Sequence, residues 1–122
     1  MIRSVKLEKE AALDVARLMA ACARTAPKTR GLDNVVTCAI NDRKTKTRLI
    51  ATMKKLGARD ARPGFARDAD SIAGAPVVIV IGIRAHPAGL NCGFCGYPAC
   101  ADLAGTPGLC AYNAIDLGIA VG

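Results

Sequence analysis

The stretch Ala75-Pro76-Val77-Val78-Ile79-Val80-Ile81-Gly82-Ile83 decides the fold, because it is the longest apolar run in the chain. Its β-branched residues predict a strand, and a strand without alternating polar positions is typical of a sheet covered by helices on both faces. A second β-branched run, Val35-Val36-Thr37-Cys38-Ala39-Ile40, predicts another strand. The apolar run is much shorter than the ~20 residues that a membrane-spanning helix needs, so we expect no membrane span.

Helical patterns precede and separate the two strands. In the first segment the apolar positions repeat every three or four residues: Leu7, Ala11, Val15, Leu18 and Cys22. This repeat predicts a helix over residues 4–23 with the repeated side chains in the core, so we expect the Cys22 thiol to be buried, and Cys38 likewise in its strand. A basic helix is expected over 43–56, with Gly57 as its C-terminal stop, and a short helix over 67–73.

The alternation of helix, strand, helix and strand predicts an α+β fold, layered as in α/β proteins. We expect one domain, with an α/β scaffold over residues 1–90, a cysteine-rich segment over 91–111 and the start of a helix over 112–122. Because Trp is absent, the core must be built from Ala, Val, Ile and Leu. No stop signal follows the last helix, so we expect a truncated chain. The first residues resemble charged helix rather than a signal peptide, which predicts a cytoplasmic protein.

Four of the six cysteines lie close together, at the spacing C-x2-C-x4-C-x9-C: Cys92, Cys95, Cys100 and Cys110. Three closely spaced cysteines with a fourth further on are typical of an iron–sulfur site, and four thiolates complete a [4Fe–4S] cluster. Zinc is one alternative, although zinc ribbons use two C-x2-C pairs and this segment has only one. A disulfide is the other alternative, which a reducing cytoplasm disfavours. Gly93 and Gly96 would let N–H donors approach the cluster and raise its potential.

Charged residues outside this segment suggest partners. The net charge of +7 favours an acidic redox protein as partner. Nucleic acid is not expected as a partner, because few aromatic side chains are available for stacking on bases. The sequence allows either a monomer or a homodimer. His86, the single histidine, is either an exposed loop residue or an alternative ligand. Arg24, Lys28 and Arg30 form either a phosphate cradle or a solvated loop.

The segment Cys92-Gly93-Phe94-Cys95-Gly96-Tyr97-Pro98-Ala99-Cys100 resembles the C-G-x-C-G-Y-P-x-C motif of a [4Fe–4S] domain. That domain occurs in the B subunit of the Rnf electron-transport complex and in corrinoid iron–sulfur proteins. The resemblance implies iron ligation by the matching cysteines. Cys110 departs from it, because the gap before this fourth cysteine is shorter than in those families.

A longer resemblance adds four segments to the cysteines: Ala23–Lys28, Gly31–Asp33, Cys110–Asn113 and Asp116–Gly122. Together they are similar to an uncharacterised prokaryotic family of ferredoxin-domain-containing proteins. The resemblance implies a cluster held by all four cysteines, and it implies no known reaction. Members of that family continue past the position of Gly122, which supports the expected truncation.

A third resemblance is to FMN-dependent nitroreductases. Ala23-Arg24-Thr25-Ala26-Pro27-Lys28 resembles their A-R-x-A-P-S loop, and Asp116-Leu117-Gly118-Ile119-Ala120 resembles the D-x-G-x-A start of a later helix. Lys28 replaces the usual Ser, and the cysteine block is an insertion. The resemblance implies a nitroreductase-like half and FMN phosphate near Arg24, Lys28 and Arg30.

The sequence therefore predicts a ferredoxin-like electron-transfer protein with one [4Fe–4S] cluster on Cys92, Cys95, Cys100 and Cys110. An iron–sulfur flavoprotein (FMN) reductase is the first alternative, and a zinc-stapled basic module that contacts nucleic acid is the second. The sequence does not show whether the protein is an enzyme, and it identifies no catalytic residues.

Overall fold

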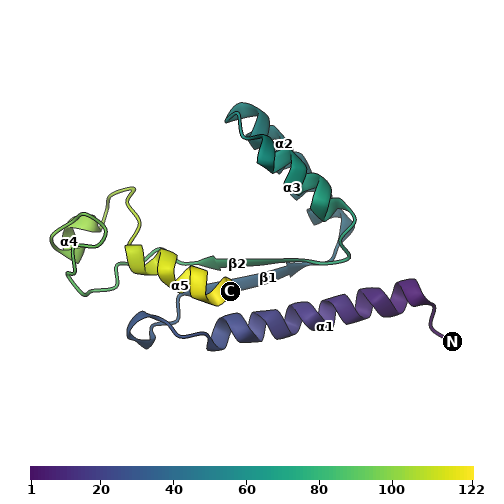
Figure 1. Ribbon diagram of the computed structural model, residues 1–122, viewed down its shortest axis with the longest axis horizontal. Helices are drawn as coiled ribbons and strands as arrows, with labels where there is room; N and C mark the ends of the chain where they lie inside the picture. The colour runs from purple at the N-terminus through teal and green to yellow at the C-terminus, as the bar shows by residue number, and fades with distance from the viewer. The chain divides into compact units, whose positions relative to one another are not determined.

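The two β-branched runs form strands, as predicted. In the computed structural model, which describes residues 1–122, they pair as a two-stranded antiparallel sheet (Figure 1). Arg84 donates its backbone N–H to the Asn34 carbonyl, 2.9 Å away, at one end of this ladder. The elements follow in the order α1 (Ser4–Thr25), the 3-10 turn η1 (Thr29–Gly31), β1 (Val35–Ile40), α2 (Arg43–Arg59), α3 (Pro63–Ala73), β2 (Val78–Ile83), α4 (Cys100–Leu103) and α5 (Ala111–Val121). The fold is therefore α+β.

The chain divides into two compact units, and each is built from two separated segments. Unit 1 comprises Met1–Leu18 and Ala39–Val80, and unit 2 comprises Met19–Cys38 and Ile81–Gly122. Helix α1 and both strands therefore contribute residues to each unit. Unit 1 contains α2 and α3, whereas η1, α4, α5 and the four clustered cysteines belong to unit 2.

In unit 1, α2 and α3 pack against each other. Asp42 caps the start of α2 by accepting the Thr45 N–H at 2.7 Å. The predicted stop at Gly57 is wrong, because α2 continues through this residue to Arg59. Gly57 is buried, and a Cβ there would lie 2.9 Å from Phe65 Cβ, so the missing side chain is what lets α3 approach. A Lys54–Asp70 ion pair of 2.6 Å also links the two helices.

Unit 2 has two small apolar clusters, in which three of the six buried residues are alanine. Ala23, Val35 and Ala120 form the first cluster, which brings together residues of α1, β1 and α5. The second contains Ala88, Leu103 and Cys110. Alanine side chains are short, so these elements approach closely but each contact buries little area.

Two burial predictions are wrong. The stripe that includes Leu7 and Leu18 is exposed, at 50% and 67%, whereas Ala16 and Ala23 are the buried residues of α1. The alanines of α1 also recur at helical spacing, so the helix has apolar residues on more than one face and periodicity alone does not select the buried one. The Cys22 thiol is consequently exposed, and Cys38 in β1 is exposed as well, in a strand of which only Val35 is buried.

The expected cover on both faces of β2 is also absent, because none of its residues is buried. A sheet of only two strands offers little surface for helices to cover, and the flanking α1 buries small residues only. No helix combines the length and apolarity that crossing a membrane requires.

Candidate functional site: the cysteine loop of unit 2

After β2, irregular chain leads through the short helix α4 to α5 (Figure 1). We call residues 88–110 the cysteine loop. The four predicted ligands differ in exposure: Cys92 is exposed, Cys95 and Cys100 are half-buried, and Cys110 is buried just before α5. No three Cys, His, Asp or Glu side chains are gathered in a metal-binding arrangement. All four thiols nevertheless belong to one loop of one unit.

Asn91 and Cys100 make a reciprocal pair of hydrogen bonds. The backbone N–H of Asn91 donates to Cys100 Sγ at 3.3 Å, and the backbone N–H of Cys100 donates to Asn91 Oδ1 at 2.8 Å. Asn91 has a φ of 47°, a left-handed conformation that asparagine adopts more readily than most residues. The residue before Cys92 therefore holds the third cysteine at the start of α4.

The Cys100 sulfur lies among backbone donors. Its pKa is lowered first by the N–H of Asn91, in opposition to desolvation, and then by the N–H groups of Gly89 and Leu90 and by the charge of Arg30. Metal ions bind the thiolate form of cysteine, so these donors favour the state that ligation needs. A turn of successive backbone N–H groups is also a known way of binding anionic groups.

The other side of the loop is apolar. Half-buried Cys95, Tyr97 and Tyr112 pack against the cluster that contains Cys110, so Cys95 and Cys110 share one apolar environment. Phe94 is 71% exposed, and its ring meets the edge of Tyr112 at a centroid distance of 5.9 Å. The structure thus places Cys95 with Cys110 on the apolar side and Cys100 among polar donors.

Gly93 and Gly96 have positive φ angles of 72° and 85°. A Cβ at either position would meet no atom within 4 Å, so conformation rather than space requires glycine here. Gly96 N–H donates to the Gly93 carbonyl at 2.9 Å and closes a tight turn that contains the second cysteine, Cys95. The Gly96 N–H is thus used within the turn, and that the Gly93 N–H points at a cluster stays a prediction.

His86 is exposed and lies two residues before the cysteine loop. It borders a small cavity of about 130 Å³ together with Cys110 and Asn113. Its backbone N–H donates to Asn113 Oδ1 at 2.9 Å. Asn113 is only 2% exposed, so α5 uses a buried amide to hold the chain that leads into the cysteine loop.

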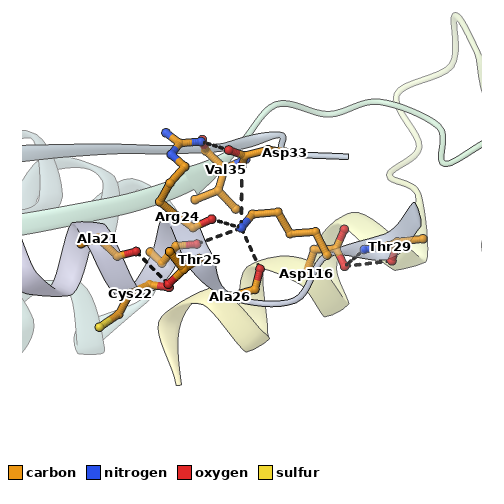
Figure 2. Close-up of polar contacts among 11 residues, drawn as sticks. Ala21, Cys22, Arg24, Thr25, Ala26, Thr29, Asp33, Val35 and Asp116 are labelled. Carbon is orange, nitrogen blue, oxygen red and sulfur yellow. Dashed lines mark hydrogen bonds and ion pairs between the residues drawn. The ribbon is translucent and has the colours of Figure 1, made fainter. Parts of the chain in front are cut away.

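The three cations predicted to contact phosphate have different surroundings. Lys28 Nζ donates to the carbonyls of Ala23, Arg24 and Ala26 at 3.2, 2.5 and 2.8 Å, and its side chain is only 5% exposed. It therefore caps the C-terminus of α1, where a cation is favoured by the helix dipole. Arg24 pairs with Asp33, whose pKa it lowers, and donates to the Val35 carbonyl at 2.8 Å (Figure 2).

Arg30 is separate from that pair and contacts the cysteine loop. Its Nη1 donates to the Ala88 carbonyl at 2.9 Å. The neighbouring Thr29 donates through its backbone N–H and its hydroxyl to Asp116 Oδ1, at 3.0 and 2.8 Å (Figure 2). Asp116 is 4% exposed, so it joins α5 to η1 through buried hydrogen bonds.

Sequence reasoning did not assign these roles to Asn91, Asn113 and Asp116. A signal was available for two of them, because Cys110, Asn113 and Asp116 follow one another at intervals of three in an otherwise apolar helix. Polar residues on the same face as a buried cysteine indicate buried hydrogen bonds. Asn91 had no comparable signal, because its conformation depends on the surrounding loop.

Unit 1 has its own hollow and its own charge pattern. The hollow is about 830 Å³, and its border includes Glu8, Arg43 and Lys46 but none of the predicted site residues. Three exposed cations of α2 lie at helical spacing and make no ion pair or hydrogen bond: Lys44, Arg48 and Lys55. We call these three residues the α2 cationic face.

Comparison with known proteins adds one relative. No known protein family matches the chain, and no solved structure matches it either. An uncharacterized protein of Archaeoglobus fulgidus is 34% identical over 116 residues, which cover 88% of this chain and 62% of the relative. The chain therefore spans less than two thirds of the length of the relative it matches.

Proposed function

We propose that this protein carries one [4Fe–4S] cluster and transfers single electrons, with Cys92, Cys95, Cys100 and Cys110 as ligands. The observation that carries the proposal is the presence of four cysteines at iron–sulfur spacing on one loop. The resemblance of the first three to a [4Fe–4S] motif supports it. When bound, such a cluster supplies a reversible one-electron couple.

The residues of the loop fit this group chemically. Cys100 lies among N–H donors that favour its thiolate, and Gly93 and Gly96 supply the two positive φ angles that the turn around Cys95 requires. Hydrogen bonds to cluster sulfur and limited solvent access both tune the reduction potential. Asn91 orients Cys100, while the apolar packing of Cys95 and Cys110 keeps water from one side of the loop.

An acidic redox protein is the partner that the charge favours. The α2 cationic face is exposed and free of ion pairs, so it is available for an acidic surface. We place the protein in the cytoplasm as part of this proposal, because a reducing compartment keeps thiolates available for iron. A homodimer is compatible with the proposal but no contact requires it.

An FMN-binding reductase with a nitroreductase-like half is the second candidate. One observation favours it: Thr29, which follows the A-R-x-A-P segment, hydrogen-bonds Asp116, which opens the D-x-G-x-A segment. The residue that follows the first of these two segments therefore contacts the second. Lys28 and Arg24, however, already bind carbonyls and Asp33, so Arg30 is the cation of the three with the fewest competing partners.

Anaerobic purification followed by assays of iron, sulfide, zinc and flavin tests the proposal. We expect broad visible absorbance and about four irons and four sulfides per chain. Replacing Cys92, Cys95, Cys100 or Cys110 by Ser should lower the iron content, whereas Cys22→Ser and Cys38→Ser are matched controls that should keep it. Colourless protein with one zinc per chain would contradict the proposal, and bound flavin beside the cluster would favour the reductase.

A further inference from the structure

Arg30 reaches the cysteine loop from a distant part of the sequence. Its guanidinium donates to the carbonyl of Ala88, which is 58 positions later in the chain and only 7% exposed. The same nitrogen lies 2.8 Å from the position that a Cβ on Gly89 would occupy. Arg30 therefore packs directly against the backbone of residues 88 and 89, and the space it fills is available only because residue 89 is glycine.

The backbone of Arg30 is in an unfavourable conformation. Its φ is 57° and its ψ is 16°, in the left-handed region that residues with a Cβ rarely adopt. Glycine or asparagine would occupy this position with less strain. A left-handed arginine indicates that the side chain contributes something that these residues would not.

What Arg30 supports is the backbone that faces Cys100. The N–H groups of Gly89, Leu90 and Asn91 act on the Cys100 sulfur, and the Asn91 N–H lies 3.3 Å from it. Gly89 and Asn91 have φ angles of 73° and 47°, so this turn is left-handed at both ends. Ala88, the first residue of this segment, packs with Leu103 and Cys110 and accepts the Arg30 hydrogen bond, so Arg30 fixes the segment where it leaves the apolar cluster.

We propose that Arg30 is a positioning residue of the cluster site, which holds residues 88–91 so that the backbone N–H of Asn91 points at the Cys100 ligand. The inference rests on the proposed function. Hydrogen bonds to ligand sulfur and nearby positive charge both stabilise the reduced, more negative cluster and raise its potential. Arg30 supplies the charge directly and the hydrogen bonds through the turn.

The test uses three variants of the cluster-loaded protein. Arg30→Gln removes the charge and the planar donor. Gly89→Ala keeps the charge but puts a Cβ on a residue with a φ of 73° and within 2.8 Å of the Arg30 guanidinium, so it strains the turn and shifts the guanidinium away from it. Arg84→Gln is the control, because Arg84 is an exposed arginine of unit 2 whose side chain makes no hydrogen bond or ion pair. The readouts are the cluster midpoint potential and the hydrogen exchange of the amides of residues 89–91.

Arg30→Gln should lower the potential by about 59 mV relative to Arg84→Gln, which corresponds to a tenfold change in a one-electron equilibrium. Gly89→Ala should lower the midpoint potential as well. If Arg30→Gln does not retain the cluster, the potential of Gly89→Ala provides the test. Both variants should speed exchange of the amides of residues 89–91. A potential that matches the control would overturn the inference, and so would a lowered potential with unchanged exchange, since the charge would then act without positioning the turn.

The outcome also separates this inference from the function on which it depends. If the wild-type protein holds no iron or sulfide, the proposed function and the inference both fail. If the wild type holds the cluster and the potentials of Arg30→Gln and Gly89→Ala equal that of Arg84→Gln, only the role of Arg30 fails.

Discussion

Lys28→Met should destabilise the protein strongly, because Lys28 caps the C-terminal end of α1 and is not free to bind a phosphate group. Three carbonyls accept hydrogen bonds from its ammonium group, and Asp33 Oδ1 lies 3.8 Å from it. Methionine keeps most of the apolar stem but donates no hydrogen bond. The variant therefore isolates the capping interaction.

The magnitude follows from the burial of the accepting groups. Ala23 is fully buried, so its carbonyl cannot recruit water easily, and a buried acceptor left without a partner costs about 1–3 kcal/mol. Losing a cation at the C-terminus of a helix costs about 0.3–1 kcal/mol more. The carbonyls of Arg24 and Ala26 are more accessible and can bind water instead. We expect the free energy of unfolding to fall by about 2–3 kcal/mol.

Urea unfolding followed by far-UV circular dichroism measures this loss. With a urea dependence of about 1–3 kcal/mol per molar, the midpoint should fall by roughly 1–2 M. Lys9→Met is the matched control, since Lys9 is an exposed lysine of the same helix without a hydrogen-bond or ion-pair partner. If Lys28→Met unfolds at the same midpoint as the control and instead only loses bound flavin, the capping role is refuted and the phosphate role is supported.

Three further predictions concern other parts of the molecule. Gly57→Ala should lower the free energy of unfolding by about 1–2 kcal/mol, because the clash of its Cβ with Phe65 outweighs the gain in helix propensity of up to ~1 kcal/mol. Gly74→Ala is the control, because a Cβ there meets no atom within 4 Å, and a Gly57→Ala variant more stable than wild type would show that α3 adjusts freely. Arg24 lowers the pKa of Asp33 below 3.8, so this pair stabilises the protein above that pH and its contribution is lost as the pH falls through the lowered pKa. The free energy of unfolding, measured from pH 5 to pH 2, should therefore depend on pH less steeply in Asp33→Asn than in the wild type. Equal pH dependence in the two proteins would exclude the pair as a source of acid sensitivity. Replacing the three residues of the α2 cationic face by glutamine should slow electron transfer with an acidic ferredoxin several-fold at low salt but not at high salt, as measured by stopped flow. Rates equal to those of the wild type at every salt concentration would place docking elsewhere.

The secondary structure was largely predictable from local pattern. The predicted strand over 35–40 coincides with β1, and the first helix begins at Ser4 as expected. These elements depend on β-branched content and helical spacing, which are properties of neighbouring residues. Gly57 shows the limit of such reasoning, because glycine serves equally as a helix stop or as a site of close packing, and only the position of Phe65 decides between them.

Burial was much less predictable. Helix α1 has apolar residues around much of its circumference, so its sequence does not say whether leucine or alanine faces the core. The structure buries Ala16 and Ala23 and leaves Leu18 exposed. The reason is tertiary: Ala23 packs with Val35 and Ala120, two residues from distant parts of the chain. The same choice exposes the Cys22 thiol.

The candidate site divides in the same way. The sequence by itself determined which thiols are the candidate ligands, because the spacing of Cys92, Cys95, Cys100 and Cys110 is a local property of one segment. Only the tertiary structure decided what surrounds them. Arg30 contacts Ala88 and Thr29 contacts Asp116 across 58 and 87 positions of sequence. Hydrogen bonds over such separations depend on how the chain returns to itself, which no local spacing encodes.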